Sequence, residues 1–269
     1  MNTRPLTLIF GLFITSIVWA ISNNVPHELL FLGKPVDPLC FSNVDSRSKV
    51  IDLNNCGITK EKLTKSGENR HLINAGFVGF DWQDPKASYS SQGLSYYKVF
   101  DAGGRHYWVY TVNNSSGSGD FTAINSVKVK QVGLLEVSHL MSGDRCNGGI
   151  HDVKERNQHL LFSVNITAYD FLTLTNDNPH QLKAYDDLAA CATCCVANAF
   201  YEVDSSLIPK LNGVDLGSDA DDPTKMVSQG RYQGCFNTLL AAHVLRGEST
   251  LNPAKLSQLV KEFNGKCVK

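Results

Sequence analysis

Residues 94–112 read LSYYKVFDAGGRHYWVYTV, and this stretch decides the fold class. Aromatic and β-branched residues, which favour strands, flank the sequence Asp101-Ala102-Gly103-Gly104. Aspartate and glycine at the centre of such a segment are typical of a tight turn, so the pattern predicts a β-hairpin. In the returning half, 106–112, large side chains occupy both odd and even positions, and we expect both faces of that strand to be covered.

More strands follow the hairpin. Lys128 and Lys130 alternate with valines, which is the pattern of a strand with one face in water. Asn147-Gly148-Gly149 tolerates positive φ angles and predicts a turn between two later strands. The predicted strands lie at residues 121–132, 134–140, 150–153 and 160–166. We therefore expect residues 93–167 to form an antiparallel β region, either a meander or a partly closed barrel.

The hydrophobic period lengthens to three or four residues after Thr167, which indicates helices. Thr167 is expected to cap the first of them, and Asn252-Pro253 is a typical helix start. The predicted helices lie at residues 169–174, 182–200, 232–245 and from 253 to the residue before Gly265. The expected fold class is α+β, with a disulfide-stabilised helical part at 168–269 after the β region. Residues 21–92 show no clear period and are expected to form an irregular or mixed N-terminal segment.

The N-terminus is typical of a secretory signal peptide. Arg4 precedes the apolar run Leu6–Ala20, which ends in the small or compact residues that a signal peptidase accepts. A helix over that run would rise about 22 Å, which is less than the hydrocarbon core of about 30 Å. We therefore expect residues 1–20 to be removed, leaving a secreted or periplasmic chain with no permanent membrane anchor.

The eight cysteines form an even set, and export would place them in an oxidising compartment. A bridge between Cys40 and Cys56 would close a short loop, and one from Cys146 to Cys194 or Cys195 would clamp the sheet to the helices. The sequence does not set the connectivity, but we expect every cysteine to be paired. The full set is Cys40, Cys56, Cys146, Cys191, Cys194, Cys195, Cys235 and Cys267.

A redox or metal centre at Cys191, Cys194 and Cys195 is the alternative to structural crosslinks. A reactive Cys-x-x-Cys pair is typically found at a helix N-terminus beside a βαβ unit. Here the pair falls inside a predicted helix, and no βαβ pattern surrounds it. We therefore favour disulfide bridges over redox or thiolate-metal chemistry.

Composition disfavours nucleic-acid binding. The chain has 25 basic and 26 acidic residues, a formal net charge of -1 and no long run of either sign. Binding driven by neutralisation of phosphates needs a basic surface, which this balance does not suggest. The sequence also contains no Gly-x-Ser-x-Gly elbow, phosphate-binding glycine loop or dinucleotide fingerprint.

The densest group of candidate catalytic residues lies at 143–152. Asp144, His151 and Asp152 supply titratable groups for a hydrolase, and Arg145 could bind a carboxylate or phosphate. Adjacent residues on a strand point to opposite faces, which argues against a dyad of His151 and Asp152. The alternative is a disulfide-pinned hairpin in which Asp144 and Arg145 satisfy backbone groups of the turn.

Two further groups of residues are candidate binding sites. Trp108 and Tyr110 could present an aromatic platform to a sugar or peptide, although aromatic residues on strands more often fill the core. A loop rich in carboxylates could bind calcium, the one cofactor that the sequence suggests, although it lacks the glycine and glutamate of an EF-hand. A solvated acidic turn is the alternative. The candidate calcium ligands are Asp215, Asp219, Asp221 and Asp222.

Two functions remain open on the sequence alone. The first is an exported, disulfide-rich binding or interaction module, whose loops at 113–120 and 143–152 recognise an extracellular protein, peptide or glycan. The second is an exported hydrolase with a His/Asp site, with or without a metal. An enzyme should bring His151 and a carboxylate together in one concave pocket, whereas a binding module should present a groove or an aromatic surface.

Overall fold

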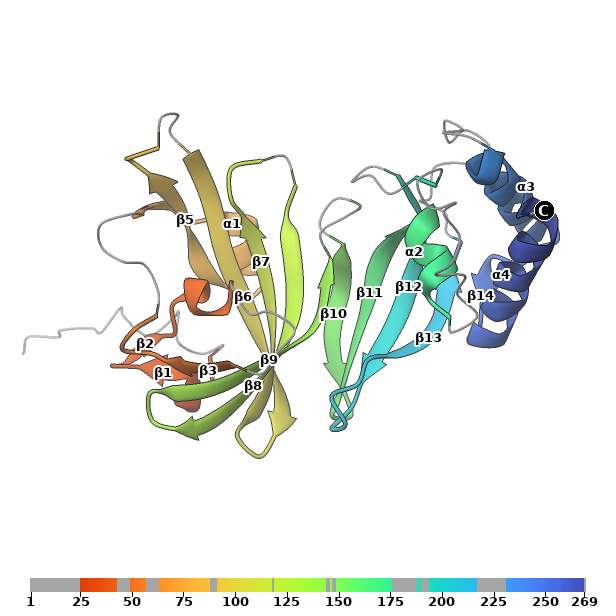
Figure 1. Ribbon diagram of the computed structural model, residues 1–269. Coiled ribbons are helices and arrows are strands. Elements are labelled where there is room, and N and C mark those ends of the chain that lie inside the picture. Colours follow the sequence, from red (N-terminus) through yellow and green to blue (C-terminus); the bar gives the residue numbers. More distant parts are fainter. Residues whose placement is uncertain are drawn as a thin grey trace, which may run out of the picture.

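The computed structural model describes residues 25–42, 49–56, 63–87, 91–117, 119–143, 146, 149–175, 188–189, 194–216 and 231–268. The described chain is mostly antiparallel β-sheet with a few helices (Figure 1). Two short 3-10 helices, η2 (His27–Leu29) and η3 (Pro38–Phe41), flank the small hairpin of β1 (Leu30–Phe31) and β2 (Lys34–Pro35). The expected signal peptide at 1–20 lies outside the described residues.

A seven-stranded sheet forms the first half of the molecule, in the order β3-β9-β8-β7-β6-β5-β4. The predicted hairpin at 94–112 is confirmed, because these residues belong to β6 and β7, which pair antiparallel. In the described residues the edge strands β3 and β4 do not pair with each other, so this sheet is not a closed barrel. Strands β4 to β9 form a meander, and β3 pairs with β9 at the other edge. Its strands are β3 (Lys49–Asp52), β4 (Thr64–Gly67), β5 (Val78–Asp84), β6 (Ser91–Gly103), β7 (His106–Asn114), β8 (Phe121–Gln131) and β9 (Leu134–Gly143).

A five-stranded antiparallel sheet follows, in the order β10-β11-β12-β13-β14. The strands predicted between 121 and 166 are confirmed, but they are divided between the two sheets, because β9 ends the first and β10 begins the second (Figure 1). The strands of this sheet are β10 (Ile150–Arg156), β11 (His159–Thr167), β12 (Cys195–Val203), β13 (Lys210–Asp215) and β14 (Thr250–Leu251).

The helices are α1 (Arg70–Asn74), α2 (Ala168–Thr173), α3 (Arg231–Leu245) and α4 (Pro253–Cys267). The predicted capping of α2 is confirmed, because Thr167 and Asp170 form a reciprocal capping box. Asn252 accepts a hydrogen bond from the Lys255 amide at the start of α4, as expected of an N-cap. The predicted end of α4 before Gly265 is wrong, since the helix continues to Cys267.

The helix predicted at 182–200 is wrong at residues 195–200, which belong to β12. Alanines at 197 and 199 suit a helix, but here they occupy alternate positions of a strand and face the core, where both are almost fully buried. Pairing with β11 and β13 on both sides overrides the local preference for helix. Apart from 188–189 and 194, the rest of the predicted helix lies outside the described residues.

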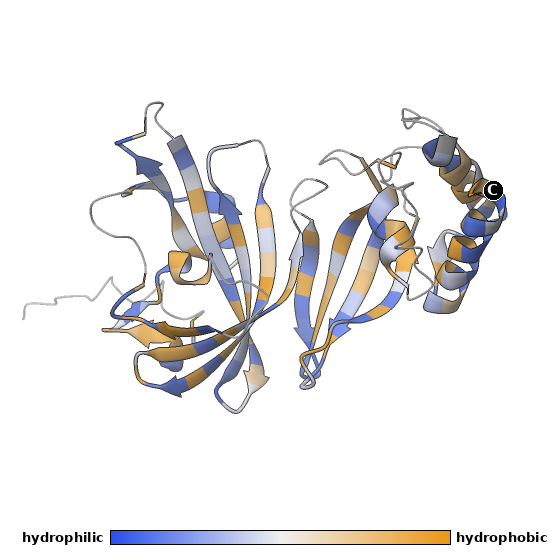
Figure 2. Cartoon of the chain, in the orientation of Figure 1, coloured by the Kyte–Doolittle hydropathy of each residue, from blue (hydrophilic) through white to orange (hydrophobic). Residues whose placement is uncertain are grey.

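Two hydrophobic clusters hold the fold together. One joins the five-stranded sheet to α2, α3 and α4, and it includes the edge-to-face aromatic contacts Phe171–Phe236 and Phe236–Phe263. The other joins the seven-stranded sheet to the N-terminal segment at 25–53. Figure 2 shows hydrophilic and hydrophobic residues alternating along many strands, as expected where each strand has one covered face.

Disulfide bonds brace both clusters. The expectation of disulfide bonds is confirmed for two pairs, Cys40–Cys56 and Cys235 of α3 with Cys267 of α4, whose connectivity the sequence left open. Cys194 is also disulfide-bonded, whereas Cys191 lies outside the described residues. Cys146 is buried, and Cys195 is half-buried at the start of β12. None of the helices in the described part of the chain combines the length and hydropathy needed to span a bilayer.

Candidate functional site

A pocket of about 480 Å³ lies on the five-stranded sheet. This volume falls within the range of about 300 to 1,000 Å³ that is usual for small-ligand sites. Four neighbouring strands, β10 to β13, supply its walls. The lining residues are Asp152, Val153, Lys154, Leu161, Phe162, Ser163, Phe200, Tyr201 and Asn212.

The pocket lies where two strand pairs are irregular. The register of β10 against β11 shifts between His151 and Lys154, and that of β12 against β13 shifts at Phe200 and Tyr201. A bulge inserts an unpaired residue, which bends the strand and increases its twist. Asp152, with φ 51°, adopts the left-handed conformation that aspartate tolerates better than most residues. We infer that these two bulges hollow the sheet between them.

Aromatic and aliphatic side chains make the pocket mainly apolar. The rings of Phe162 and Tyr201 stack with their centroids 5.5 Å apart. Phe200 is 38% exposed, which is unusual for a phenylalanine on a central strand, and Leu161 is half-buried beside it. Burial raises the pKa of Tyr201 to about 12, so its hydroxyl keeps its proton at neutral pH.

Charged and polar side chains form the rim. Asp152, Lys154 and Asn212 line the pocket and are exposed. The Asn212 amide donates to a Glu202 oxygen over 3.1 Å, and His159 contacts the other oxygen of that carboxylate. Hydrogen bonds from Asn212 and His159 lower the pKa of Glu202, which keeps this carboxylate ionised. The rim therefore carries both signs of charge.

The hydrolase candidates at 150–152 do not form a catalytic pair. The Asn165 amide nitrogen lies 3.1 Å from the Cys146 carbonyl oxygen and 2.7 Å from His151 Nε2. Because an amide nitrogen only donates, His151 Nε2 accepts and is occupied. Ser163 Oγ donates to Asp152 over 3.3 Å and is not bonded to the histidine. Within the described residues, therefore, His151 and Asp152 bond to different partners and not to each other.

The end of β9 and the start of β10, between which the chain passes from one sheet to the other, lie against each other. Gly143 and Gly149 lie back to back, so that a Cβ on Gly149 would stand 2.3 Å from the Gly143 Cα. Thr122 Oγ1 donates to the Gly143 carbonyl and accepts from the Ile150 amide, each over 3.1 Å. Asp144 and Arg145, predicted as catalytic and ligand-binding residues, lie outside the described residues.

The aromatic residues predicted as a platform lie in the interior. Trp108 is completely buried, and Tyr110 is half-buried with its hydroxyl donating to the Ile150 carbonyl over 2.8 Å. Burial raises the pKa of Tyr110 well above its ordinary value. These two residues therefore join the sheets, which agrees with the core interpretation of this aromatic pattern.

Of the four candidate calcium ligands, the structure describes only Asp215. Asp215 is half-buried at the end of β13, opposite Asn198 and Thr250 in the strand register. Asp219, Asp221 and Asp222 lie outside the described residues. The residues that the structure does place contain no group of three or more His, Cys, Asp or Glu side chains that could hold a metal ion.

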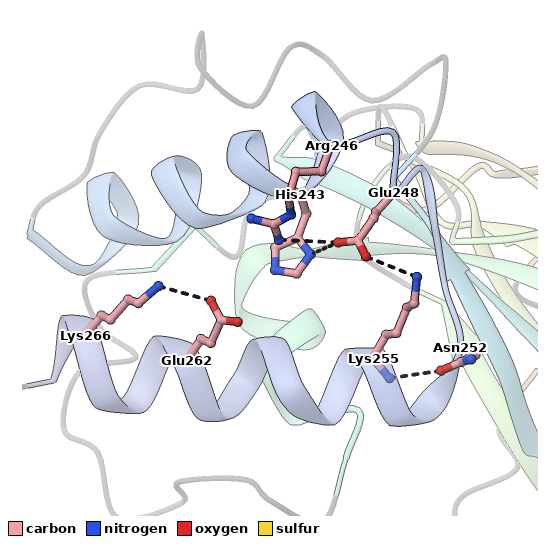
Figure 3. Close-up of polar contacts among 7 residues, drawn as sticks. All are labelled: His243, Arg246, Glu248, Asn252, Lys255, Glu262 and Lys266. Atoms are coloured by element: carbon pink, nitrogen blue, oxygen red, sulfur yellow. Dashed lines mark hydrogen bonds and ion pairs between the residues drawn. The ribbon is translucent and has the colours of Figure 1, made fainter.

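A second polar cluster connects α3 to α4 (Figure 3). Glu248 accepts hydrogen bonds from His243 Nδ1 over 2.6 Å, from Lys255 over 3.1 Å and from Arg246 over 3.3 Å. Hydrogen bonds from Lys255 and His243 lower the pKa of Glu248 to about 2. His243 is 5% exposed, so this cluster holds the turn between the helices and is not an open site.

Sequence reasoning missed the residues that give the pocket its apolar surface, above all Phe200. The segment 196–203, VANAFYEV, contains valines and aromatic residues of high strand propensity, a signal that competes with the helical spacing of its alanines. The bulges that hollow the sheet have no comparable signature in the sequence. Comparisons with protein-family models, with curated proteins and with solved structures found no match to this chain.

Proposed function

We propose that this protein is an exported binding module that takes an apolar or aromatic side chain of an extracellular protein or peptide into the β10–β13 pocket. The observation that carries the proposal is the exposed apolar surface of this pocket, in which Phe200 stands beside Leu161. Burying such surface against a ligand is the usual source of affinity at small concave sites.

The position of the pocket favours an extended peptide. In the described part of the chain, β10 is an edge strand whose hydrogen-bonded neighbour is β11. A peptide strand that adds to a sheet edge binds through its backbone and places alternate side chains toward adjoining pockets. Asp152 and Lys154, which lie on β10 and line the pocket, would then select for charge in the flanking ligand residues.

Two observations support export. The sequence at 1–20 has the pattern of a secretory signal, and the described chain contains disulfide bonds. Disulfides persist mainly in oxidising compartments, which favours a secreted or periplasmic location. A mature chain that begins near residue 21 and is recovered from the exported fraction is the expected result; reduced protein retained in the cytosol would contradict it.

The binding proposal is tested by selecting a displayed library of random short peptides on the purified protein. We expect enrichment of peptides that share an aromatic or large aliphatic residue. The Phe200→Asp variant should bind the enriched peptides about tenfold more weakly or worse, because it places a charge in the apolar part of the pocket.

The matched control is Ile208→Asp. Ile208 is 64% exposed in the loop between β12 and β13 and does not line the pocket, so its variant should bind like the wild type. Thermal unfolding of both variants checks that the fold is retained. Failure to enrich any peptide, or equal binding by the wild type and Phe200→Asp, would refute the proposal.

A further inference from the structure

Two hairpins end in large aliphatic side chains that contact little of the protein. The two-residue turn between β1 and β2 is Leu32-Gly33, and the one between β8 and β9 is Val132-Gly133. Leu32 is 87% exposed and Val132 is 91% exposed. Packing of the fold therefore gives no reason for an apolar residue at either position.

Leu32 is also unfavourable for its turn. Leu32 has φ 51° and Gly33 has φ 75°, the pattern of a type I′ hairpin turn. Asparagine, aspartate or glycine is preferred at the first of these positions, because other side chains crowd the backbone there. A leucine that is both exposed and in a left-handed conformation suggests a role outside folding.

The two turns lie at the same corner of the molecule (Figure 1). The Phe31 ring lies 3.6 Å from the position that a Cβ on Gly133 would occupy. The Leu53 amide donates to the Gly133 carbonyl over 2.9 Å, which fixes the β8–β9 turn against the N-terminal segment. Leu32 and Val132 therefore project from adjoining turns, and we call them the tip pair.

A lysine lies two residues from each member of the tip pair in the sequence. Lys34 is two residues after Leu32, and Lys130 is two residues before Val132; both are exposed. Two strand residues span about 7 Å. Side chains that insert into a bilayer interface reach about 5 to 10 Å below the headgroups. The long lysine side chains would then hold their ammonium groups at headgroup level.

We propose that the tip pair inserts into an anionic lipid surface, with Lys34 and Lys130 bound to the headgroups. Lys130 forms an ion pair with Glu136 over 2.9 Å, and because such surface pairs are weak, it can exchange this partner for a lipid phosphate. A lipid surface fits better than a protein partner because the tips project and are almost fully exposed, whereas a stable protein interface needs a broad complementary area. This peripheral contact is reversible and independent of the β10–β13 pocket.

The test is co-sedimentation of the exported protein with vesicles of phosphatidylcholine alone and of phosphatidylcholine with phosphatidylglycerol. We expect binding to the anionic vesicles that weakens with salt, and little binding to the neutral ones. The variant Leu32→Asn/Val132→Ser should bind about tenfold less. Lys34→Gln/Lys130→Gln should lose mainly the preference for anionic lipid.

Leu245→Ser is the matched control, because Leu245 is equally exposed, at 87%, but lies at the end of α3. Asparagine suits the β1–β2 turn, so Leu32→Asn/Val132→Ser should unfold at the same or a higher temperature than the wild type. All variants share the same N-terminal segment before the described residues, so binding through that segment would be common to them. The proposal would be overturned if the wild type did not bind vesicles, or if it bound them no better than Leu32→Asn/Val132→Ser. It would also be overturned if those substitutions changed only the self-association of the protein.

Discussion

Replacing both Cys235 and Cys267 with alanine should lower the free energy of unfolding by between about 4 and 5 kcal/mol. The bridge joins α3 to α4 across a sequence separation of 32. In the chain-entropy model, opening a loop of this length returns about 3.7 kcal/mol to the unfolded chain. Cys267 is 2% exposed, so shortening its side chain also leaves a small void that costs about a further 1 kcal/mol.

The other described bridge provides an internal comparison. Cys40 and Cys56 are separated by 16 residues, for which the same model gives about 3.1 kcal/mol. The entropic part of the loss should therefore be about 0.6 kcal/mol smaller for Cys40→Ala/Cys56→Ala. The Phe236–Phe263 contact between α3 and α4 does not depend on the bridge, so Cys235→Ala/Cys267→Ala should keep its native helix signal.

The assay is urea unfolding without reductant, followed by far-ultraviolet circular dichroism and fitted for the free energy in water. Wild type and both double-alanine variants are compared at one protein concentration. A loss below about 1 kcal/mol for Cys235→Ala/Cys267→Ala would refute the reasoning, because it would mean that the bridge does not restrict the unfolded chain as the model requires. A larger loss for Cys40→Ala/Cys56→Ala would refute the loop-length argument.

Two further predictions concern the connecting loop and the helix pair. Gly149→Ala should lower the melting temperature and reduce the free energy of unfolding by more than about 1 kcal/mol, because Gly149 has φ 65° and a new Cβ would meet the Gly143 Cα. An unchanged melting temperature would contradict this close contact. Ionised Glu248 stabilises the fold above its ordinary pKa of 4.5, and that contribution is lost as pH falls toward its native pKa of about 2. The wild type should therefore lose more thermal stability than Glu248→Gln between about pH 5 and about pH 2, and parallel losses would rule this out.

Local patterns predicted the elements better than their arrangement. The hairpin at 94–112 and the cap of α2 depend on neighbouring residues, so alternation and turn chemistry identify them. The division of the strands into two sheets depends on contacts across the whole chain. The same limit explains the error at 195–200, where partners from β11 and β13 decide the structure.

The candidate site was harder to predict than the fold. Asp152 was predicted as a candidate catalytic residue and does line the pocket, but it does so because a bulge turns it away from the regular alternation. Phe200 was placed in a helix, which hid its exposure on the sheet. Disulfide bonds were predicted, but their connectivity was not, because Cys235–Cys267 depends on the packing of α3 against α4 and Cys40–Cys56 on the fold of the N-terminal segment.

The order of the strands bears on how the chain folds as it emerges during synthesis. Every strand of the seven-stranded sheet lies before residue 144, so these strands can pair as soon as that stretch has emerged. The second sheet is different, because β13 pairs with β14, which follows α3. Its assembly must wait until residues 250–251 arrive, and in that interval one edge of β13 stays open to neighbouring chains.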